Sequence, residues 1–334
     1  MARDLYDLIQ ASYVTNILFE MTKNDIFDLL ALKPMSAAEL ARTANLDEDV
    51  LLDILDMAVA IDFLRYDGSR YWVRRSGLLL TKASKSWLRD YLLVWGYQLN
   101  PVFSKFDEFL KQGAPPFKAF HGDNLWQKYN KEPYQNDIFL GFMNGVTNKA
   151  HMPLLVDEFR IAAGSAVVDV AGGGGALVCN VLSKRSDLTG VIYDQPSNID
   201  LAQSNIANFG IADRCKFVGG SIFDSVPGGA DVYLLKHVMH DWNDENALKI
   251  LESISRAMSK DAIFILVEGV LDTKEYDKNF PEYIHTRNVE QRIWTEGKLR
   301  RLAAHEALLN KAGLKIYDVS HTKICDASLI YSRR

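Results

Sequence analysis

The feature that most constrains this chain is an apolar strand that runs directly into four consecutive glycines. The segment 167–170 is β-prone and apolar except for Asp169, and Gly172–Gly175 follow before a helical stretch. Glycines between a strand and a helix let the backbone approach a ligand closely at the carboxyl edge of an open α/β sheet. The next strand ends at Asp194, 20 residues after Gly174, where a carboxylate can accept hydrogen bonds from ribose hydroxyls. The pattern therefore predicts a site for an adenosine-containing cofactor.

The rest of the C-terminal part extends this strand into a sheet. Further short apolar strands, separated by helical segments, lie at 190–194, 215–218, 231–235 and 263–267. Buried strands that alternate with helices predict a doubly wound, mostly parallel sheet, so we expect a Rossmann-like α/β domain. The contiguous glycines differ from the spaced G-x-G-x-x-G pattern. The alternative interpretation is that they serve only close helix–strand packing, with Asp194 a solvated loop acid.

The N-terminal part predicts a different architecture, mostly helical. Ser36 and Glu39 have the spacing of a capping box, and Asp67-Gly68 between two β-prone runs indicates a hairpin. Helices followed by a hairpin are typical of a winged-helix domain. Prolines and glycines make 100–123 a predicted loop, after which a helical linker follows. The predicted parts are a winged-helix-like domain at 1–110, a helical linker at 111–160 and the α/β domain at 161–334.

Charge and composition argue against several other classes. The net charge is −5, and the predicted second helix of the winged-helix pattern, at 49–60, carries three aspartates and no basic residue. Phosphates would repel such a helix, so a DNA-binding regulator is disfavoured and we expect no nucleic-acid partner. The chain has no apolar run of about 18 residues and starts with acids, so we expect no membrane partner. Three distant cysteines, Cys179, Cys215 and Cys325, suit a reducing compartment, and the expected location is cytoplasmic.

A second chemical motif, LLKHVMHDWNDE, begins at residue 234 directly after a strand. Its polar residues should therefore lie at the carboxyl edge of the sheet, where ligands bind. His240 is the best candidate for a general base, because imidazole titrates near neutrality. Glu268 closes the neighbouring strand and is the candidate that orients this imidazole. His237 is expected to be structural, and the alternative for His240 is a packed or helix-capping histidine.

Together, the glycine run, the acid-ended second strand, GGSIFDSVP at 219–227 and the LLKHVMHDWNDE motif resemble one family. This is the class I S-adenosylmethionine-dependent O-methyltransferases of small molecules that carry an N-terminal winged-helix dimerisation domain. The resemblance covers nearly the whole chain, and LLKHVMHDW is its most specific part. It implies S-adenosylmethionine as cofactor, S-adenosylhomocysteine as product, a homodimer, and a small aromatic or acidic methyl acceptor of specialised metabolism.

The resemblance also implies roles for individual positions. His240 would deprotonate the acceptor hydroxyl, with Glu268 and Asp241 beside it. The implied acceptor-binding residues are Met143 and Asn144 on the linker helix. The basic segment at 287–301 borders the family's acceptor pocket, and Arg292 is our candidate there. The implied cofactor-binding residues are Asp169, Ala171, Gly172 and Gly173 near the methionine moiety, Asp194 at the ribose, Gly220, Ser221, Ile222 and Phe223 around the adenine, and Lys236 beside the cofactor.

Three positions depart from the family pattern. Ala171 replaces the first glycine of the cofactor loop, and Ser221 replaces an acid that would face the adenine amine. The third departure follows the last parallel strand. The family has Gly-x-Glu-Arg-Thr there, whereas this chain has Gly297-Lys-Leu299-Arg-Arg. The second acid beside the base is therefore missing, and Glu296 is only a loose substitute.

The same region is unusually basic, with five basic and two acidic residues between 287 and 301. Arginine binds carboxylate or phosphate through two parallel hydrogen bonds, so an acidic acceptor is one interpretation. The simpler interpretation is a solvated helix face.

Two alternatives stay open at the level of chemistry. Some relatives methylate a carbon next to a carbonyl, as in a keto acid, and a subset uses a metal. In this chain His240 and Asp241, with either His285 or His305, could hold iron or zinc, and sensitivity to chelators would support that mechanism. The other alternative is a protein that binds the cofactor without methylating. Our main interpretation is O-methylation without a metal.

Overall fold

The computed structural model describes residues 5–272, 282–324 and 327–334. Its contacts divide the chain into two compact units, and Cys325 lies outside the described residues. The first unit comprises Met1–Pro101 and Tyr134–Gly145, and the second comprises Val102–Pro133 and Val146–Arg334. The division at 110 and 160 predicted from the sequence stays a prediction beside this grouping.

The first unit is built from helices and one hairpin. The predicted capping box is confirmed, since the Ser36 hydroxyl accepts from the Glu39 amide and the Glu39 carboxylate accepts from the Ser36 amide. The predicted hairpin is also confirmed, and the Asp67 side chain accepts from the amides of Ser69 and Arg70 at its turn. The elements are α1 (Leu5–Lys23), α2 (Ile26–Leu32), α3 (Ala37–Ala44), α4 (Glu48–Ala60), β1 (Leu64–Tyr66), β2 (Tyr71–Val73), α5 (Arg75–Leu78), α6 (Leu88–Val94), the π-helix η1 (Trp95–Leu99) and α10 (Pro133–Gly145).

The predicted loop at 100–123 is wrong, because this stretch folds into short helices. Gly113 and Gly122 each end one of them with a left-handed backbone, at φ 72° and φ 80°. Glycine adopts this conformation at the end of a helix without steric cost. The glycines are therefore helix stops rather than signs of an irregular segment. The helices of this stretch are η2 (Asn100–Lys105), α7 (Phe106–Gln112) and α8 (Pro116–His121), and α9 (Leu125–Lys131) follows them.

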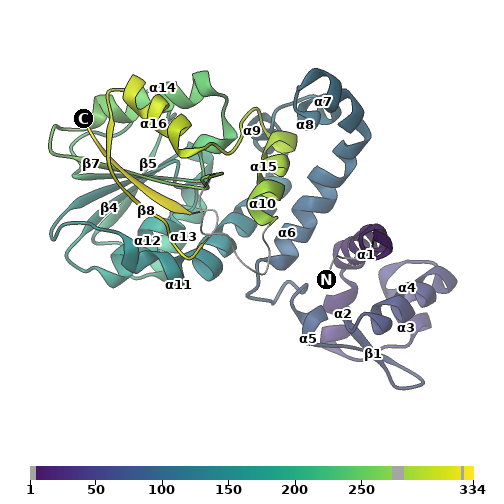
Figure 1. Ribbon diagram of the computed structural model, residues 1–334. Helices are drawn as coiled ribbons and strands as arrows, with labels where there is room; N and C mark the ends of the chain where they lie inside the picture. The colour runs from purple at the N-terminus through teal and green to yellow at the C-terminus, as the bar shows by residue number, and fades with distance from the viewer. Residues whose placement is uncertain (1–4, 273–281, 325–326) are drawn as a thin grey trace. The chain divides into compact units, whose positions relative to one another are not determined.

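The second unit contains a seven-stranded sheet in the order β5-β4-β3-β6-β7-β9-β8 (Figure 1). All five predicted strands are present and pair in parallel, which confirms the Rossmann-like prediction. The sequence analysis missed the last two strands, which pair antiparallel at the edge beyond β7. The strands are β3 (Ala166–Val170), β4 (Thr189–Asp194), β5 (Cys215–Gly219), β6 (Val232–Lys236), β7 (Ile263–Glu268), β8 (Lys315–Ser320) and β9 (Ser328–Arg333).

Helices cover both faces of this sheet, with α14 and α16 on one side and α11, α12 and α13 on the other (Figure 1). Neighbouring strand residues point to opposite faces, so Val167 belongs to one buried apolar cluster and Val168 to the other. The remaining elements are η3 (Val146–His151), α11 (Met152–Leu155), η4 (Val156–Glu158), α12 (Ala176–Lys184), η5 (Pro196–Asn198), α13 (Ile199–Asn208), η6 (Met239–Asp241), α14 (Asp244–Ala257), α15 (Tyr283–Trp294) and α16 (Leu302–Lys311).

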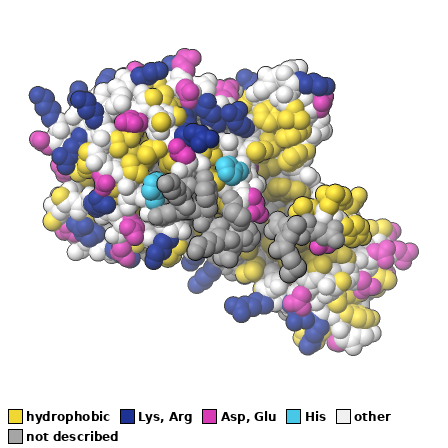
Figure 2. All heavy atoms as spheres, viewed as in Figure 1, with side chains coloured by type: hydrophobic (Ala, Val, Ile, Leu, Met, Phe, Trp, Pro, Cys, Tyr) yellow, Lys and Arg dark blue, Asp and Glu magenta, His cyan; other side chains and the backbone are white. Residues whose placement is uncertain are grey.

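The surface carries charges of both signs. Figure 2 shows basic and acidic side chains interspersed with apolar ones on the face in view.

Cys179 and Cys215 are buried and free. Within the described ranges, no helix has the length and apolar character needed to cross a bilayer.

Candidate active site

The glycine run forms a tight turn between β3 and α12. Ala171 begins it in a left-handed conformation at φ 53°, and Gly175 ends it at φ 76°. A Cβ on Gly175 would lie 2.1 Å from a methyl of Ile192, and one on Gly172 would lie 2.7 Å from the Asp169 carboxyl carbon. The turn therefore has room for backbone only, which lets a ligand approach the main chain closely. An adenosine cofactor fits such a cradle.

Two carboxylates flank this turn, Asp169 buried and Asp194 half-buried. Asp169 accepts from the Val178 amide at 3.3 Å, and burial raises the pKa of Asp169 to about 7, although this bond and the charge of Lys236 oppose the shift. Asp194 accepts from the Gly173 amide at 2.6 Å, so it fixes the glycine loop directly. Burial also raises the pKa of Asp194. Both predicted acids therefore lie at the turn.

The other predicted cofactor residues lie at the ends of β5 and β6. The Ser221 carbonyl accepts from the Tyr193 hydroxyl at 3.0 Å, and a Cβ on Gly220 would collide with the same tyrosine. The Phe223 ring packs edge-on against Trp242, with 4.8 Å between centroids. Ile222 is half-buried and packs on the sheet. Lys236 closes β6 and donates to the Thr147 hydroxyl at 3.3 Å.

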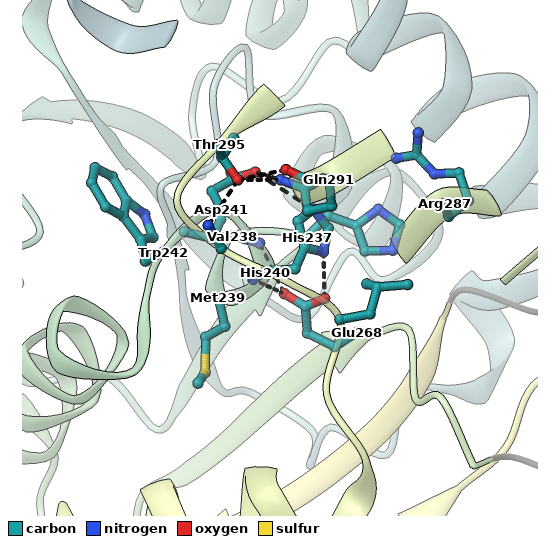
Figure 3. A network of polar contacts seen from close by, with 12 residues as sticks. His237, Val238, Met239, His240, Asp241, Trp242, Glu268, Arg287, Gln291 and Thr295 are labelled. Carbon is teal, nitrogen blue, oxygen red and sulfur yellow. Dashed lines mark hydrogen bonds and ion pairs between the residues drawn. The ribbon is translucent and has the colours of Figure 1, made fainter. Parts of the chain in front are cut away.

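His240 and Glu268 form a buried pair at the ends of β6 and β7 (Figure 3). The Nδ1 atom of His240 lies 2.6 Å from Oε2 of Glu268. The other oxygen, Oε1, accepts from the amides of Val238 and His240 at 3.1 and 3.3 Å. An ionised carboxylate here requires a proton on Nδ1, which leaves Nε2 as the basic nitrogen. Burial alone would lower the pKa of His240, but the Glu268 charge raises it above its usual value.

A second set of polar groups lies on the Nε2 side, and the sequence analysis missed most of it. An oxygen of Asp241 lies 3.7 Å from His240 Nε2. The same oxygen accepts from the Gln291 amide at 2.6 Å, and Gln291 also donates to the Thr295 hydroxyl at 3.0 Å (Figure 3). Burial raises the pKa of Asp241 to about 6, against the opposing charge of His240. Gln291 and Thr295 carry no motif that distinguishes them from ordinary helix residues.

His240 and Gln291 line a small cavity in the second unit. Its lining residues are His237, His240, Gly269, Arg287, Gln291 and Leu299. His237 lines the cavity from a left-handed conformation at φ 54°. The imidazole of His240 thus borders a space in which a small molecule's hydroxyl could be placed.

Comparison with known families is decisive at this point. The profile of the O-methyltransferase domain matches residues 103–315, which is more than half of the chain. The profile of the O-methyltransferase dimerisation domain matches residues 6–89. This chain belongs to the O-methyltransferase family. It is a methyltransferase, and the methyl donor of this family is S-adenosylmethionine.

Individual proteins show the same likeness. The mitomycin biosynthesis 6-O-methyltransferase of Streptomyces lavendulae is 26% identical over 93% of this chain and 88% of its own length. The solved structure of LaPhzM superposes with a TM-score of 0.90 at 24% identity, covering 98% of both chains. Another solved structure is an O-methyltransferase from neocarzinostatin biosynthesis in complex with S-adenosyl-L-homocysteine and 1,4-dihydroxy-2-naphthoic acid. It superposes with a TM-score of 0.85 at 24% identity, covering 100% of this chain and 99% of that chain.

The position of the missing family acid is now defined. Leu299 is buried and lines the cavity in its place, while Glu296 is exposed and lies 3.5 Å from the Asn243 amide. The next residue corrects our interpretation of the basic segment as a solvated face. Arg300 is 2% exposed and donates to the carbonyls of Met239 and Trp242, at 2.7 and 2.8 Å.

The implied acceptor residues of the methyltransferase stay predictions. Met143 and Asn144 lie in α10, in the first unit, and Arg292 is exposed on α15. From the same helix, Arg287 lines the cavity instead. The metal-ligand group considered from the sequence is not assembled: within the described ranges, no cluster of three or more His, Cys, Asp or Glu side chains is arranged to hold a metal. His285 is exposed and His305 is buried in α16.

Proposed function

We propose that this methyltransferase methylates a hydroxyl oxygen of a small aromatic metabolite, with His240 as general base. The observation that carries the proposal is the 2.6 Å contact between His240 Nδ1 and Glu268 beside the cavity. It fixes the tautomer, so that Nε2 accepts the proton of the acceptor hydroxyl. The Glu268 carboxylate then stabilises the imidazolium that forms. The names of two relatives, a 3-amino-4-hydroxybenzoate 4-O-methyltransferase and a 2,7-dihydroxy-5-methyl-1-naphthoate 7-O-methyltransferase, support an aromatic acceptor.

The cofactor would lie at the glycine turn, on the carboxyl edge of the sheet. When bound, S-adenosylmethionine supplies an electrophilic methyl group on a sulfonium. Asp169 and the backbone at Ala171–Gly173 would lie beside its methionine part, Asp194 would hold its ribose, and the segment 220–223 would flank its adenine, with Lys236 alongside. The chain's contribution is to hold the acceptor oxygen in line with that methyl group and to remove the proton as the oxygen becomes nucleophilic.

Features of the first unit support a homodimer, and the cysteines support the proposed location. Helix α1 exposes Leu5, Tyr6, Ile9 and Tyr13 to solvent, and contiguous exposed apolar patches mark interaction surfaces. The dimerisation profile covers the same helix, which supports a homodimer as the functional state. Free, buried Cys179 and Cys215 accord with a cytoplasmic location, which stays a prediction.

The experiment is a calorimetric titration of S-adenosylhomocysteine into the wild type, Asp194→Ala and Asp200→Ala. Asp200 is exposed in the first turn of α13 and serves as the matched control for loss of a carboxylate near the loop. We expect micromolar binding to the wild type and the control, and clearly weaker binding to Asp194→Ala in folded protein. Absence of binding to the folded wild type would mean that the glycine turn serves packing alone.

A further inference from the structure

One side of the cavity carries a permanent positive charge. Among the described residues that line it, Arg287 is the one group that is charged at every physiological pH, and none of them is acidic. Its charge reaches the base, because it is one of the contributions that lower the pKa of His240, against the larger opposing effect of Glu268. An anion in the cavity would therefore meet a cation and no lining carboxylate.

The arginine is held in place by a neighbour that does not line the cavity. Nη1 of Arg287 pairs with Glu290, one turn further along α15, and the side chains are only 20% and 13% exposed. The second carboxylate oxygen of Glu290 is buried with no hydrogen-bond partner among the described residues. The pair thus fixes a half-desolvated guanidinium, a group with five donors in a fork that fits a carboxylate.

Leu299, which departs from the family pattern, also favours an anion in the cavity. The family pattern places a glutamate there, and such a side chain would put a second anion among the residues that line this cavity. Leucine removes that anion and offers an apolar contact for a ring instead. One wall is therefore apolar, one carries the base, and one carries a cation.

We propose that Arg287 binds a carboxylate of the methyl acceptor, so that the substrate is a hydroxylated aromatic carboxylic acid. The hydroxyl faces Nε2 of His240, the ring packs on Leu299, and the carboxylate pairs with the Arg287 guanidinium. This assignment rests on the proposed function and names its substrate class. Bound carboxylate also offsets the charge of Arg287 near the base, which makes protonation of His240 easier once the acceptor is in place.

The test compares two probes of one shape, 1-hydroxy-2-naphthoate and 1-hydroxy-2-naphthamide, with 2-hydroxybenzoate as a smaller acid. Each is titrated calorimetrically into protein saturated with S-adenosylhomocysteine. We expect the naphthoate to bind the wild type at least about tenfold more tightly than the amide, as is typical of a charge-assisted hydrogen-bonded pair. Arg287→Gln should abolish that preference, and Arg287→Lys should retain part of it.

Matched variants make the outcome specific. Arg256→Gln removes an exposed charge from α14 and should leave the preference intact. Because Arg287→Gln strands the Glu290 carboxylate, the double variant Arg287→Gln/Glu290→Gln provides a second, charge-balanced measurement, and it too should lose the preference.

Four results would overturn the assignment. The first is equal binding of acid and amide, and the second is no binding of either acid below about 1 mM. The third is loss of the preference in Arg292→Gln but not in Arg287→Gln. The fourth is weaker S-adenosylhomocysteine binding in Arg287→Gln, which would assign the arginine to the cofactor's own carboxylate. Failure of the proposed function is distinct, because then S-adenosylhomocysteine would not bind the wild type at all.

Discussion

The cofactor turn and the base cluster lie at one sheet edge but are assembled in different ways. Asp194 reaches the Gly173 amide across 21 residues of chain, between neighbouring strands. The base cluster spans longer separations: His240 meets Glu268 across 28 residues, Asp241 meets Gln291 across 50, and Met239 meets Arg300 across 61. The cofactor turn is therefore encoded in one strand–turn–helix–strand unit, whereas the base cluster depends on side chains from the more distant segment 268–300.

The largest expected effect tests whether the base cluster governs chemistry independently of the cofactor turn. His240→Gln removes the proton acceptor but keeps a polar side chain of similar size. We expect kcat to fall by roughly 10²–10⁴-fold, the usual contribution of a general base, while S-adenosylhomocysteine affinity stays within about twofold. Single-turnover methylation and calorimetry on the same preparation measure the two quantities. Retention of most of the activity would remove His240 from the mechanism.

The next prediction concerns the longest connection of the cluster. Arg300→Met removes the Arg300 donor from the Trp242 carbonyl and leaves the Met239 carbonyl with the Trp242 amide alone. An orphaned buried oxygen costs about 1–3 kcal/mol. We expect a lower free energy of unfolding and a lower kcat, because both carbonyls belong to the turn that carries His240. Arg301→Met, which removes an exposed charge from the next position, is the control. Equal urea midpoints for the two variants would contradict the anchoring role.

The third prediction tests whether the cofactor turn governs cofactor affinity independently of the base cluster. In Gly172→Ala the new Cβ would lie 2.7 Å from the Asp169 carboxyl carbon and would displace that side chain. We expect S-adenosylhomocysteine affinity to fall by about tenfold, on the order of 1.4 kcal/mol, with little change in kcat at saturating cofactor. Gly228→Ala, whose Cβ meets nothing closer than 3.5 Å, should leave affinity unchanged. An equal loss in both variants would mean a general effect on folding.

The same contrast explains what could be predicted from the sequence. The strands, the glycine turn, Asp194 and the capping box depend on residues close in the chain, so their periodicity and spacing suffice. His240 and Glu268 were found because each follows a strand that is neighbouring in sequence order. Gln291 could not be found in this way, since its partner lies 50 residues away. Arg300 was misread because charge counting cannot distinguish a buried arginine that donates to carbonyls from a solvated one.

The last prediction concerns the pH dependence of the stabilisation that Glu268 and His240 contribute to the folded state. Burial acts to raise the pKa of Glu268 from 4.5, but the opposing effects, led by those of His240, together outweigh it, so the pKa is lowered. The stabilisation from the ionised Glu268 is therefore present above about pH 4.5 and is lost as pH falls through the lowered pKa. His240 has a raised pKa, so its stabilisation is present below about pH 6.5 and is lost as pH rises through the raised value. Both contributions coincide between these limits.

Replacing Glu268 with Gln removes the ionisable partner while preserving side-chain shape. The difference in unfolding free energy between wild type and Glu268→Gln should therefore be largest between about pH 4.5 and 6.5 and shrink on both sides, by about 1.4 kcal/mol for each unit of pKa shift. Urea unfolding across pH measures this difference, with Glu306→Gln, an exposed substitution on α16, as control. A difference that does not vary with pH would mean that the 2.6 Å contact is a neutral hydrogen bond, and the tautomer assigned to His240 would lose its support.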